Sequence, residues 1–258
     1  MIQGVRALYR YRELIQVLIQ RELKARYRRS ALGFLWSFVN PLILTGIYLL
    51  VFSVYLRIDM ERYAGFLLCG ILAWVWLSSA LQTAANSIIQ NGGLIKKVYL
   101  PSEVFPFVSV GSNLVHYLLS IPILLGLLLA LGVQPSWAWL MFPIVVVLQF
   151  TFIYGIALIV SSVAVRFRDV LHVLPNLLML WLFLTPIFYP VTLVPEPYRV
   201  LVNVNPMFHI VHAYQDMFFY RRFPSAASLL ILIAFCGVLL AVGFAVFTSR
   251  KALFAEEV

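Results

Sequence analysis

The chain has 258 residues, of which 63% are hydrophobic and only 11% charged, and its mean hydropathy is +0.96. A soluble domain carries about 25% charged residues, so this composition excludes a soluble enzyme, a disordered chain and a disulfide scaffold, and predicts an integral membrane protein. The net charge of +9 is typical of basic loops kept in the cytoplasm beside anionic lipid, and it requires no nucleic acid.

Residues 1–35 predict a cytoplasmic amphipathic helix ahead of the membrane domain. Apolar or aromatic side chains recur at helical spacing from Leu8 to Ile19, and arginines occupy the other side. Such a helix lies on the inner membrane surface, where it either orients the protein only or also docks a partner. We expect no cleavable signal peptide, because no early apolar stretch precedes Trp36.

Residues 36–258 predict one transmembrane domain of six helices, so the fold class is all-α. Six stretches contain no Asp, Glu, Lys or Arg, and each is long enough to cross the hydrocarbon core, which takes about 20 helical residues. Charge-free windows of this length favour helices over β-barrel strands. The predicted spans are Trp36 to Leu56, Tyr63 to Ala85, Val104 to Gly132, Trp137 to Val165, Val170 to Tyr189 and Ala226 to Thr248.

The basic residues predict the orientation. With six crossings, 14 Lys and Arg fall on the side of the termini and five on the other side, namely Arg57, Arg62, Arg199, Arg221 and Arg222. The positive-inside rule then places both termini in the cytoplasm, in a multi-pass protein of the cytoplasmic membrane.

Two connections are longer than turns require. Between the second and third spans, Asn86 to Glu103 contains Gly92, Gly93 and Pro101, which bound a predicted short helix carrying Lys96 and Lys97. This loop either receives force from a docked ATPase or supplies cytoplasmic positive charge.

The second long connection is the segment 190–225, which we call the gate segment. Its apolar runs are too short to span, so we predict two short helices that lie at the outer surface or dip into it. Asn205 followed by Pro206 is typical of an N-cap with proline in the first helical turn. Irregular backbone at membrane depth is tolerated only against protein or a water-filled cavity, which favours a roof over a channel.

Few residues suggest chemistry within the chain itself. Cys69 and Cys236 lie in predicted spans and are expected to be free thiols. His209, His212 and Asp216 would share a helix face that could hold zinc, but their spacing is not a zinc-protease pattern, so a polar rim is favoured and no metal is expected. No phosphate-binding loop and no intramembrane carboxylate relay occur, so we expect no cofactor in this chain and energy from another subunit.

Aromatic residues near the middle of two spans are the candidate substrate contacts. Trp74, Trp76 and Trp181 lie where no interfacial preference explains them, and Phe183 and Tyr189 extend the set on the fifth span. Rings of this kind either line a channel for an extended glycan or pack helices together.

Four motifs in order resemble the permease subunits of ABC polysaccharide exporters, most closely those for O-antigen and teichoic acid. They are the stretch Arg26 to Leu42, the loop Arg166-Phe167-Arg168-Asp169, the run Leu184-Thr185-Pro186-Ile187-Phe188-Tyr189-Pro190, and Asn205-Pro206-Met207. The resemblance implies a homodimer with a channel at its interface, and two copies of a separate nucleotide-binding subunit that holds ATP and Mg²⁺. It also implies an undecaprenyl-type lipid-linked glycan as cargo.

Site residues follow from this resemblance. The amphipathic helix and the loop residues Gly93, Leu94, Ile95, Lys96, Lys97 and Tyr99 would contact the ATPase, and Pro190, Asn205, Pro206, His209 and His212 would belong to the outer gate. Arg28 and Arg29 are expected at the lipid headgroup, since arginine suits a pyrophosphate. Two alternatives remain: an ABC permease for small hydrophobic drugs or antibiotics, and a membrane-embedded metalloenzyme using His209, His212 and Asp216.

Overall fold

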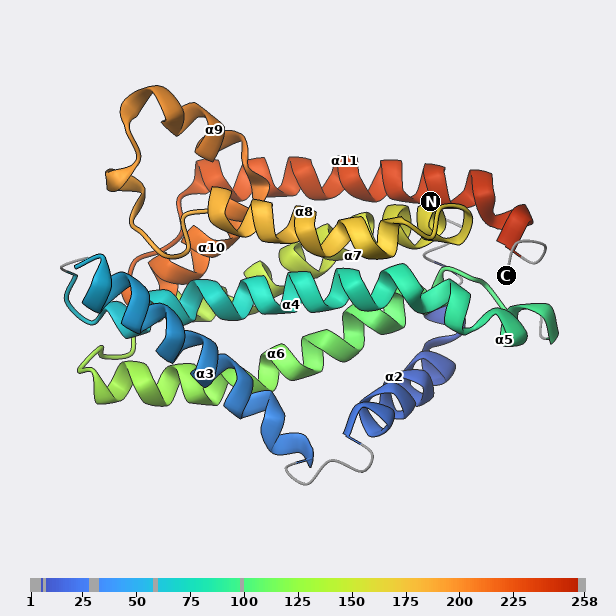
Figure 1. Ribbon diagram of the computed structural model, residues 1–258, viewed down its shortest axis with the longest axis horizontal. Helices are drawn as coiled ribbons and strands as arrows, with labels where there is room; N and C mark the ends of the chain where they lie inside the picture. Colours follow the sequence, from blue (N-terminus) through green and yellow to red (C-terminus); the bar gives the residue numbers. More distant parts are fainter. Residues whose placement is uncertain (1–5, 7, 28–32, 58–59, 98–99, 255–258) are drawn as a thin grey trace.

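The computed structural model describes residues 6, 8–27, 33–57, 60–97 and 100–254, and every regular element in these ranges is a helix. The long helices run side by side along one axis (Figure 1). They are α4 (Tyr63–Gln90), α6 (Val104–Ala130), α7 (Phe142–Arg166) and α11 (Ala226–Arg250). The predicted all-α class is confirmed for the described residues.

Four predicted spans correspond to helices that are long and apolar enough to cross a membrane: Tyr63–Gln90, Val104–Ala130, Trp137–Arg166 and Ala226–Arg250. The other two are apolar but shorter, Val39–Tyr55 and Val170–Leu184. In the first span, α3 (Trp36–Leu49) continues as a π-helical stretch, Leu50–Tyr55. The count of six crossings therefore stays a prediction.

The fifth predicted span ends early. Its helix α8 (Val170–Leu184) stops five residues before the expected boundary at Tyr189. Thr185 precedes Pro186 and adopts an extended conformation, because the proline ring disfavours helical backbone in the residue before it. The charge-free criterion missed this boundary, since residues 185–189 are uncharged like those of the helix.

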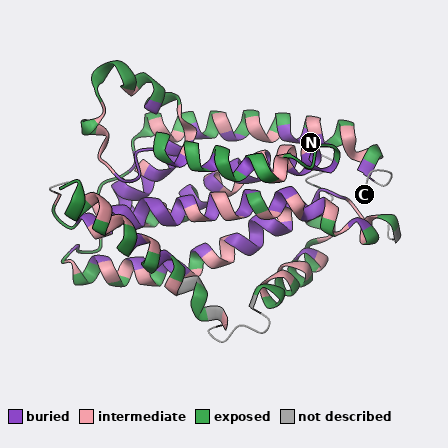
Figure 2. Cartoon of the chain, viewed as in Figure 1, coloured by how far each residue is buried: buried purple, intermediate pink, exposed green. Residues whose placement is uncertain are grey.

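α4 is the central helix of the bundle. It contacts α3, α6, α7 and α8; α3 also contacts α6, α6 contacts α7, and α7 contacts α8. These contacts surround α4 except on the side between α3 and α8, which faces the viewer in Figure 1. Figure 2 shows α4 buried over most of its surface, in contrast to the largely exposed α8 and α11.

α7 and α11 approach each other at two glycines. A Cβ atom placed on Gly243 would lie 2.5 Å from the carbonyl oxygen of Gly155, and a Cβ on Gly155 would lie 2.8 Å from the backbone of Leu239. Small residues at a crossing point let two membrane helices pack backbone against backbone. This contact fixes the position of α11 on the bundle.

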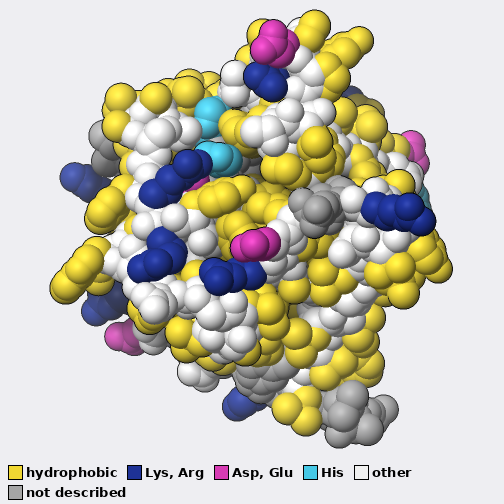
Figure 3. Space-filling model, turned by 90° about the vertical axis from the view of Figure 1, so that its left-hand side faces the viewer, with side chains coloured by type: hydrophobic (Ala, Val, Ile, Leu, Met, Phe, Trp, Pro, Cys, Tyr) yellow, Lys and Arg dark blue, Asp and Glu magenta, His cyan; other side chains and the backbone are white. Residues whose placement is uncertain are grey.

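The connections between the long helices lie at two opposite ends of the molecule. α5 (Gly92–Lys97), the connection between α7 and α8, and the end of α11 lie at one end of the molecule, whereas the loops after α3 and α6 and the helix α10 (Pro206–Tyr214) lie at the other (Figure 1). Figure 3 looks onto this second end, where basic side chains and histidines stand among hydrophobic ones.

The N-terminal amphipathic helix is present as α2 (Arg12–Tyr27), but its apolar side is covered by protein. Ile15 is buried against Val104 and Val108 at the start of α6. Ile19 packs onto Gly111, where a Cβ atom would lie 2.9 Å from its Cδ1. The sequence predicts that this side rests on the membrane surface, whereas in the structure it attaches α2 to α6.

A buried ion pair ties the chain's C-terminal region to the start of α6. The Nζ of Lys251 lies 2.8 Å from both carboxylate oxygens of Glu103. The Glu103 side chain is 8% exposed and that of Lys251 39%. The hydroxyl of Tyr154 also donates to the Glu103 carbonyl oxygen, so α6, α7 and the end of α11 meet at this point.

Candidate channel face and outer gate

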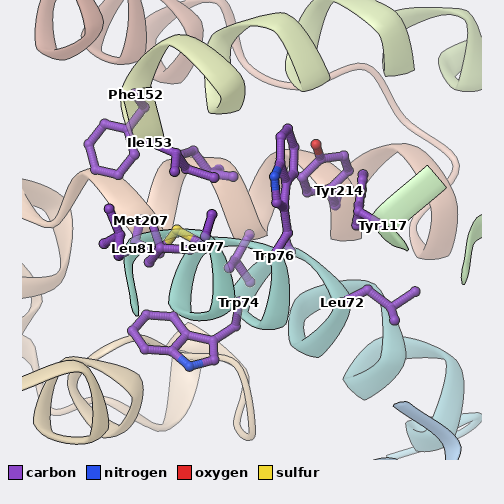
Figure 4. Close-up of a cluster of buried hydrophobic side chains, with 14 of the residues drawn as sticks. Leu72, Trp74, Trp76, Leu77, Leu81, Tyr117, Phe152, Ile153, Met207 and Tyr214 are labelled. Carbon is purple, nitrogen blue, oxygen red and sulfur yellow. The ribbon is translucent and has the colours of Figure 1, made fainter. Parts of the chain in front are cut away.

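The two tryptophans of α4 are buried and point in different directions (Figure 4). Trp76 is 2% exposed, stacks on Tyr117 at a centroid distance of 5.0 Å, and its Nε1 donates to the carbonyl oxygen of Val110. Trp74 is 4% exposed and meets Trp181 edge to face at 5.8 Å. Both rings pack helices together in this conformation, and Trp76 also borders a cavity of about 250 Å³. Contact of either ring with a substrate stays a prediction.

The side of α4 between α3 and α8 carries polar residues along a membrane-length helix. Val75, Ser78, Ser79, Gln82 and Asn86 follow a helical spacing, and Gln82 is exposed while the others are half-buried. We call these five residues the open face of α4. The side chains of Ser78 and Gln82 bond back to their own helix, with Ser78 Oγ 3.3 Å from the Val75 carbonyl and Gln82 Nε2 3.2 Å from the Ser78 carbonyl.

α8 is attached to the bundle by one stripe. Leu174, Leu178 and Leu182 are buried, while most of its other side chains are exposed, among them His172 and Asn176. Polar groups on the exposed surfaces of α4 and α8 are costly against lipid hydrocarbon. They favour contact of these surfaces with water or another protein surface over contact with lipid.

The gate segment is bonded to the end of α8 through Asn205. The Trp181 indole donates to Asn205 Oδ1 at 2.9 Å, and Asn205 Nδ2 donates to Thr185 Oγ1 at 2.9 Å. The same Oδ1 accepts from the backbone of Met207 at 3.0 Å, so Asn205 is the N-cap of α10 with Pro206 in the first turn. The predicted cap is confirmed, and its side chain also joins two elements.

Nearby side chains form hydrogen bonds with the free carbonyl groups at the end of α8. Thr185 Oγ1 donates to the Trp181 carbonyl at 2.8 Å, and Tyr189 Oη donates to the Phe183 carbonyl at 3.0 Å. Side chains thus replace helix bonds that Pro186 interrupts, which is how irregular backbone persists at membrane depth. Phe183 itself is 47% exposed.

A largely apolar cavity of about 560 Å³ opens beneath the gate segment. Trp181, Tyr189 and Tyr198 line it together with aliphatic side chains of α9 (Arg199–Val204). Asn205 and Pro206 lie at its edge. Of the aromatic residues singled out from the sequence, Trp181 and Tyr189 therefore share one cavity.

The two histidines of α10 have separate partners. His209 is buried, with Nε2 2.8 Å from the Asn203 carbonyl and Nδ1 3.2 Å from Ser228 Oγ. His212 Nδ1 lies 3.1 Å from the carboxylate of Asp216, which also pairs with Arg222 at 2.7 Å. Within the described residues no group of three His, Cys, Asp or Glu could hold a metal ion.

The predicted docking loop forms α5, the short helix expected between the glycines and Pro101. Gly93 and Lys96 are exposed, and Leu94 and Ile95 are half-buried. Pro190 is half-buried in the gate segment. The structure does not describe Arg28, Arg29 or Tyr99, and it does not describe the side chain of Lys97.

Helices of membrane-crossing length, a polar face on the central one and a folded gate segment define a polytopic membrane protein of the transporter type. The family model for the ABC-2 type transporter matches residues 13–219, and the chain belongs to this family.

Three relatives illustrate what the chain is similar to. It is 41% identical over 260 residues, covering 100% of both chains, to the O-antigen export system permease protein RfbA of Myxococcus xanthus. It is 32% identical to the protein of the same name from Klebsiella pneumoniae, over 95% of this chain and 94% of that one. It is 25% identical to the polysialic acid transport protein KpsM of Escherichia coli, over 92% and 93%.

Proposed function

We propose that the chain is the channel-forming permease subunit of an ATP-driven exporter that moves a lipid-linked polysaccharide across the cytoplasmic membrane. The observation that carries the proposal is the open face of α4, a polar strip on the central membrane helix between α3 and α8. The similarity to relatives named as O-antigen and polysialic acid permeases supports polysaccharide as the cargo.

A second copy of the chain completes the channel in this proposal. α3 and α8 flank the open face and expose apolar side chains, including Leu42, Ile47, Leu177 and Leu180. A twofold partner that packs on these apolar ridges would enclose two open faces, and closed two-fold dimers are the commonest oligomers. The polar strip would then line an aqueous path and not meet lipid.

ATP hydrolysis takes place on a separate subunit, two copies of which dock below the permease with their ATP and Mg²⁺. The exposed part of α5 and the basic outer side of α2 are the surfaces for this contact, at the end where the 14-to-5 charge bias places the cytoplasm. Closure of the ATPase pair pushes α5 and α2, and α2 moves α6 because Ile15 and Ile19 pack against it.

The outer end provides the exit. The glycan would pass along the open face and reach the aromatic cavity beneath the gate segment, where Trp181 and Tyr189 offer ring faces and Phe183 is exposed close by. Asn205 holds the gate segment against α8. These hydrogen bonds must break, or the gate segment must tilt, when the polymer passes.

Export in purified vesicles tests this function. The permease and its ATPase partner are reconstituted in proteoliposomes with a labelled lipid-linked glycan, and ATP-dependent transfer of label across the bilayer is measured. We expect transfer of the glycan and no ATP-dependent transport of small amphiphilic drugs. Transport of the drugs without the glycan would replace this proposal by the drug-permease alternative.

Replacing Asn205 with Leu is expected to loosen the gate. The change removes three side-chain hydrogen bonds, each worth about 1 kcal/mol, and leaves the Trp181 indole without its acceptor. Amide hydrogen exchange in the first turn of α10 should therefore accelerate by roughly 100-fold.

The matched control is Asn203→Leu, since Asn203 is an exposed asparagine two residues earlier on α9. This variant should leave exchange in α10 unchanged. Equal exchange in both variants would show that the Asn205 side chain does not hold the gate segment.

A further inference from the structure

A polar cavity lies between the end of α2, the start of α3 and the middle of α4 and α6. Its volume is about 250 Å³. Its polar lining comes from all four helices and consists of Arg26, Asn40, Ser79, Asn113, His116 and Ser120. This cavity is separate from the aromatic cavity beneath the gate segment, and it shares only Val75 and Ser79 with the open face of α4.

The cavity extends from the inner membrane interface into the bundle. Trp36, 38% exposed at the start of α3, stands at its rim, where tryptophan is expected at the level of lipid headgroups. His116 lies 12 residues into α6, which corresponds to about 18 Å along the helix. Polar side chains at such depth are costly, so they mark functional positions more often than structural ones.

The charge of the cavity selects an anion. Its lining contains one arginine and no Asp or Glu. Arg26 Nη1 donates to Asn113 Oδ1 at 3.1 Å, and among the described residues no carboxylate forms an ion pair with it. The remaining N–H groups of the guanidinium fork suit phosphate oxygens.

Asn113 holds the arginine in place. It is 2% exposed, and its Nδ2 donates to the Ser109 carbonyl at 2.8 Å and lies 3.5 Å from Thr83 Oγ1. With Nδ2 turned to these two acceptors, Oδ1 points to Arg26. A fixed, buried amide that orients one cation is a preorganised site rather than a loose surface charge.

Glu22, one turn before Arg26, belongs to a different cavity. It lines a space with Arg21, Gln90 and Asn91. Burial raises the pKa of its carboxyl group, and the nearby Arg26 opposes this rise. Glu22 is therefore not among the residues that line the cavity around Arg26 and Asn113.

We propose that this cavity binds the phosphate headgroup of a lipid from the inner leaflet, and specifically the phosphate that links a polyprenyl carrier to its glycan. Arg26 contacts the phosphate oxygens, and Asn113 is the positioning residue. The apolar part of the lining, including Leu72, Val75 and Pro41, favours a lipid over free phosphate. This assignment rests on the proposed export of a lipid-linked glycan and gives the carrier a defined position beside the open face.

Equilibrium binding tests the site without any transport step. The protein is placed in phosphatidylcholine nanodiscs, and binding of radiolabelled undecaprenyl phosphate is compared with that of undecaprenol, which lacks the phosphate. We expect saturable binding of the phosphate form only. Arg26→Gln should weaken it by about 10- to 100-fold, the usual range for a hydrogen bond to a charged group.

Lys24→Gln is the matched control, because Lys24 is an exposed cation two residues away on the same helix and does not line the cavity. Equal weakening by both variants, or equal binding of undecaprenol, would overturn the site. Displacement of the lipid by millimolar pyrophosphate, with pyrophosphate binding lost in Arg26→Gln, would reassign it to free phosphate. Arg26→Gln is expected to fold; if it does not, the wild-type comparison of the two lipids decides alone.

Failure of the phosphate site and failure of the proposed export function give different results. Saturable binding with no glycan export in proteoliposomes would overturn the export function and leave the phosphate site standing. If undecaprenyl phosphate does not bind and Arg26→Gln leaves glycan export unchanged, the phosphate site is wrong and the export function stands.

Discussion

Gly243→Ala is expected to destabilise the protein more than any other single methyl addition on α11. The new Cβ would lie 2.5 Å from the Gly155 carbonyl oxygen and 3.3 Å from its Cα. Both are backbone atoms, so no side chain can turn aside and the two helices must separate. Overpacking of this kind costs typically 1–3 kcal/mol, and we expect a loss of about 3 kcal/mol in the free energy of unfolding, measured by denaturant titration in detergent micelles.

Gly237→Ala provides the control on the same helix. Gly237 has no atom within 4 Å of the position of an added Cβ. Because alanine is the better helix former, this variant should be neutral or more stable by up to about 1 kcal/mol. Similar destabilisation of both variants would show that the contact between α7 and α11 is not as close as the structure has it.

Lys251→Met is expected to lower stability by about 2 kcal/mol. The change leaves the Glu103 carboxylate 8% exposed and without its cation. Removing one partner of a fully buried pair costs about 3–5 kcal/mol, and the loss is smaller here because Lys251 is 39% exposed. The same unfolding titration measures it.

The double variant Glu103→Gln with Lys251→Met checks the cause. A neutral amide needs no counter-ion, so the double variant should recover most of the lost stability. If it were as unstable as Lys251→Met, the ion pair would not account for the effect, and packing of the lysine stem would be the alternative.

Local signals in the sequence predicted local structure well. Charge-free windows located the long helices because a charge inside hydrocarbon is costly, and Asn205-Pro206 predicted a helix start because capping is decided within two residues. The end of α8 was missed since Thr185 and Pro186 stop a helix without adding a charge.

The tryptophans of α4 show how far residue spacing predicts side-chain placement. Trp74 and Trp76 are two residues apart, which is about 200° around a helix, so they could not share one face. The structure places one against Trp181 and the other against Tyr117. Spacing could have separated them, whereas their partners on α8 and α6 could not be predicted.

Polar contacts between distant parts of the chain were beyond sequence reasoning. Glu103 and Lys251 are 148 residues apart, and Arg26 and Asn113 are 87 apart. In the sequence each is a single charged or polar residue near a span, and only packing of α2, α6 and α11 shows its partner. The open face of α4 was also missed, although its serines, Gln82 and Asn86 follow a helical spacing that could have been noticed.

The claim that the open face of α4 lines an aqueous path can be tested by thiol accessibility. The buried Cys69 and Cys236 are first replaced by Ala. Ser78→Cys then probes the open face, and Val238→Cys probes the exposed outer surface of α11. Each position lies 12 residues before the end of its helix, so the two are matched in depth.

Each variant is assembled with its ATPase partner in membranes and treated, during ATP turnover, with a charged thiol reagent that does not cross the bilayer. The account predicts rapid modification at position 78 and none at position 238, because only the first faces water. Modification at 238 with protection at 78 would contradict it, and would place the path for the polymer elsewhere in the bundle.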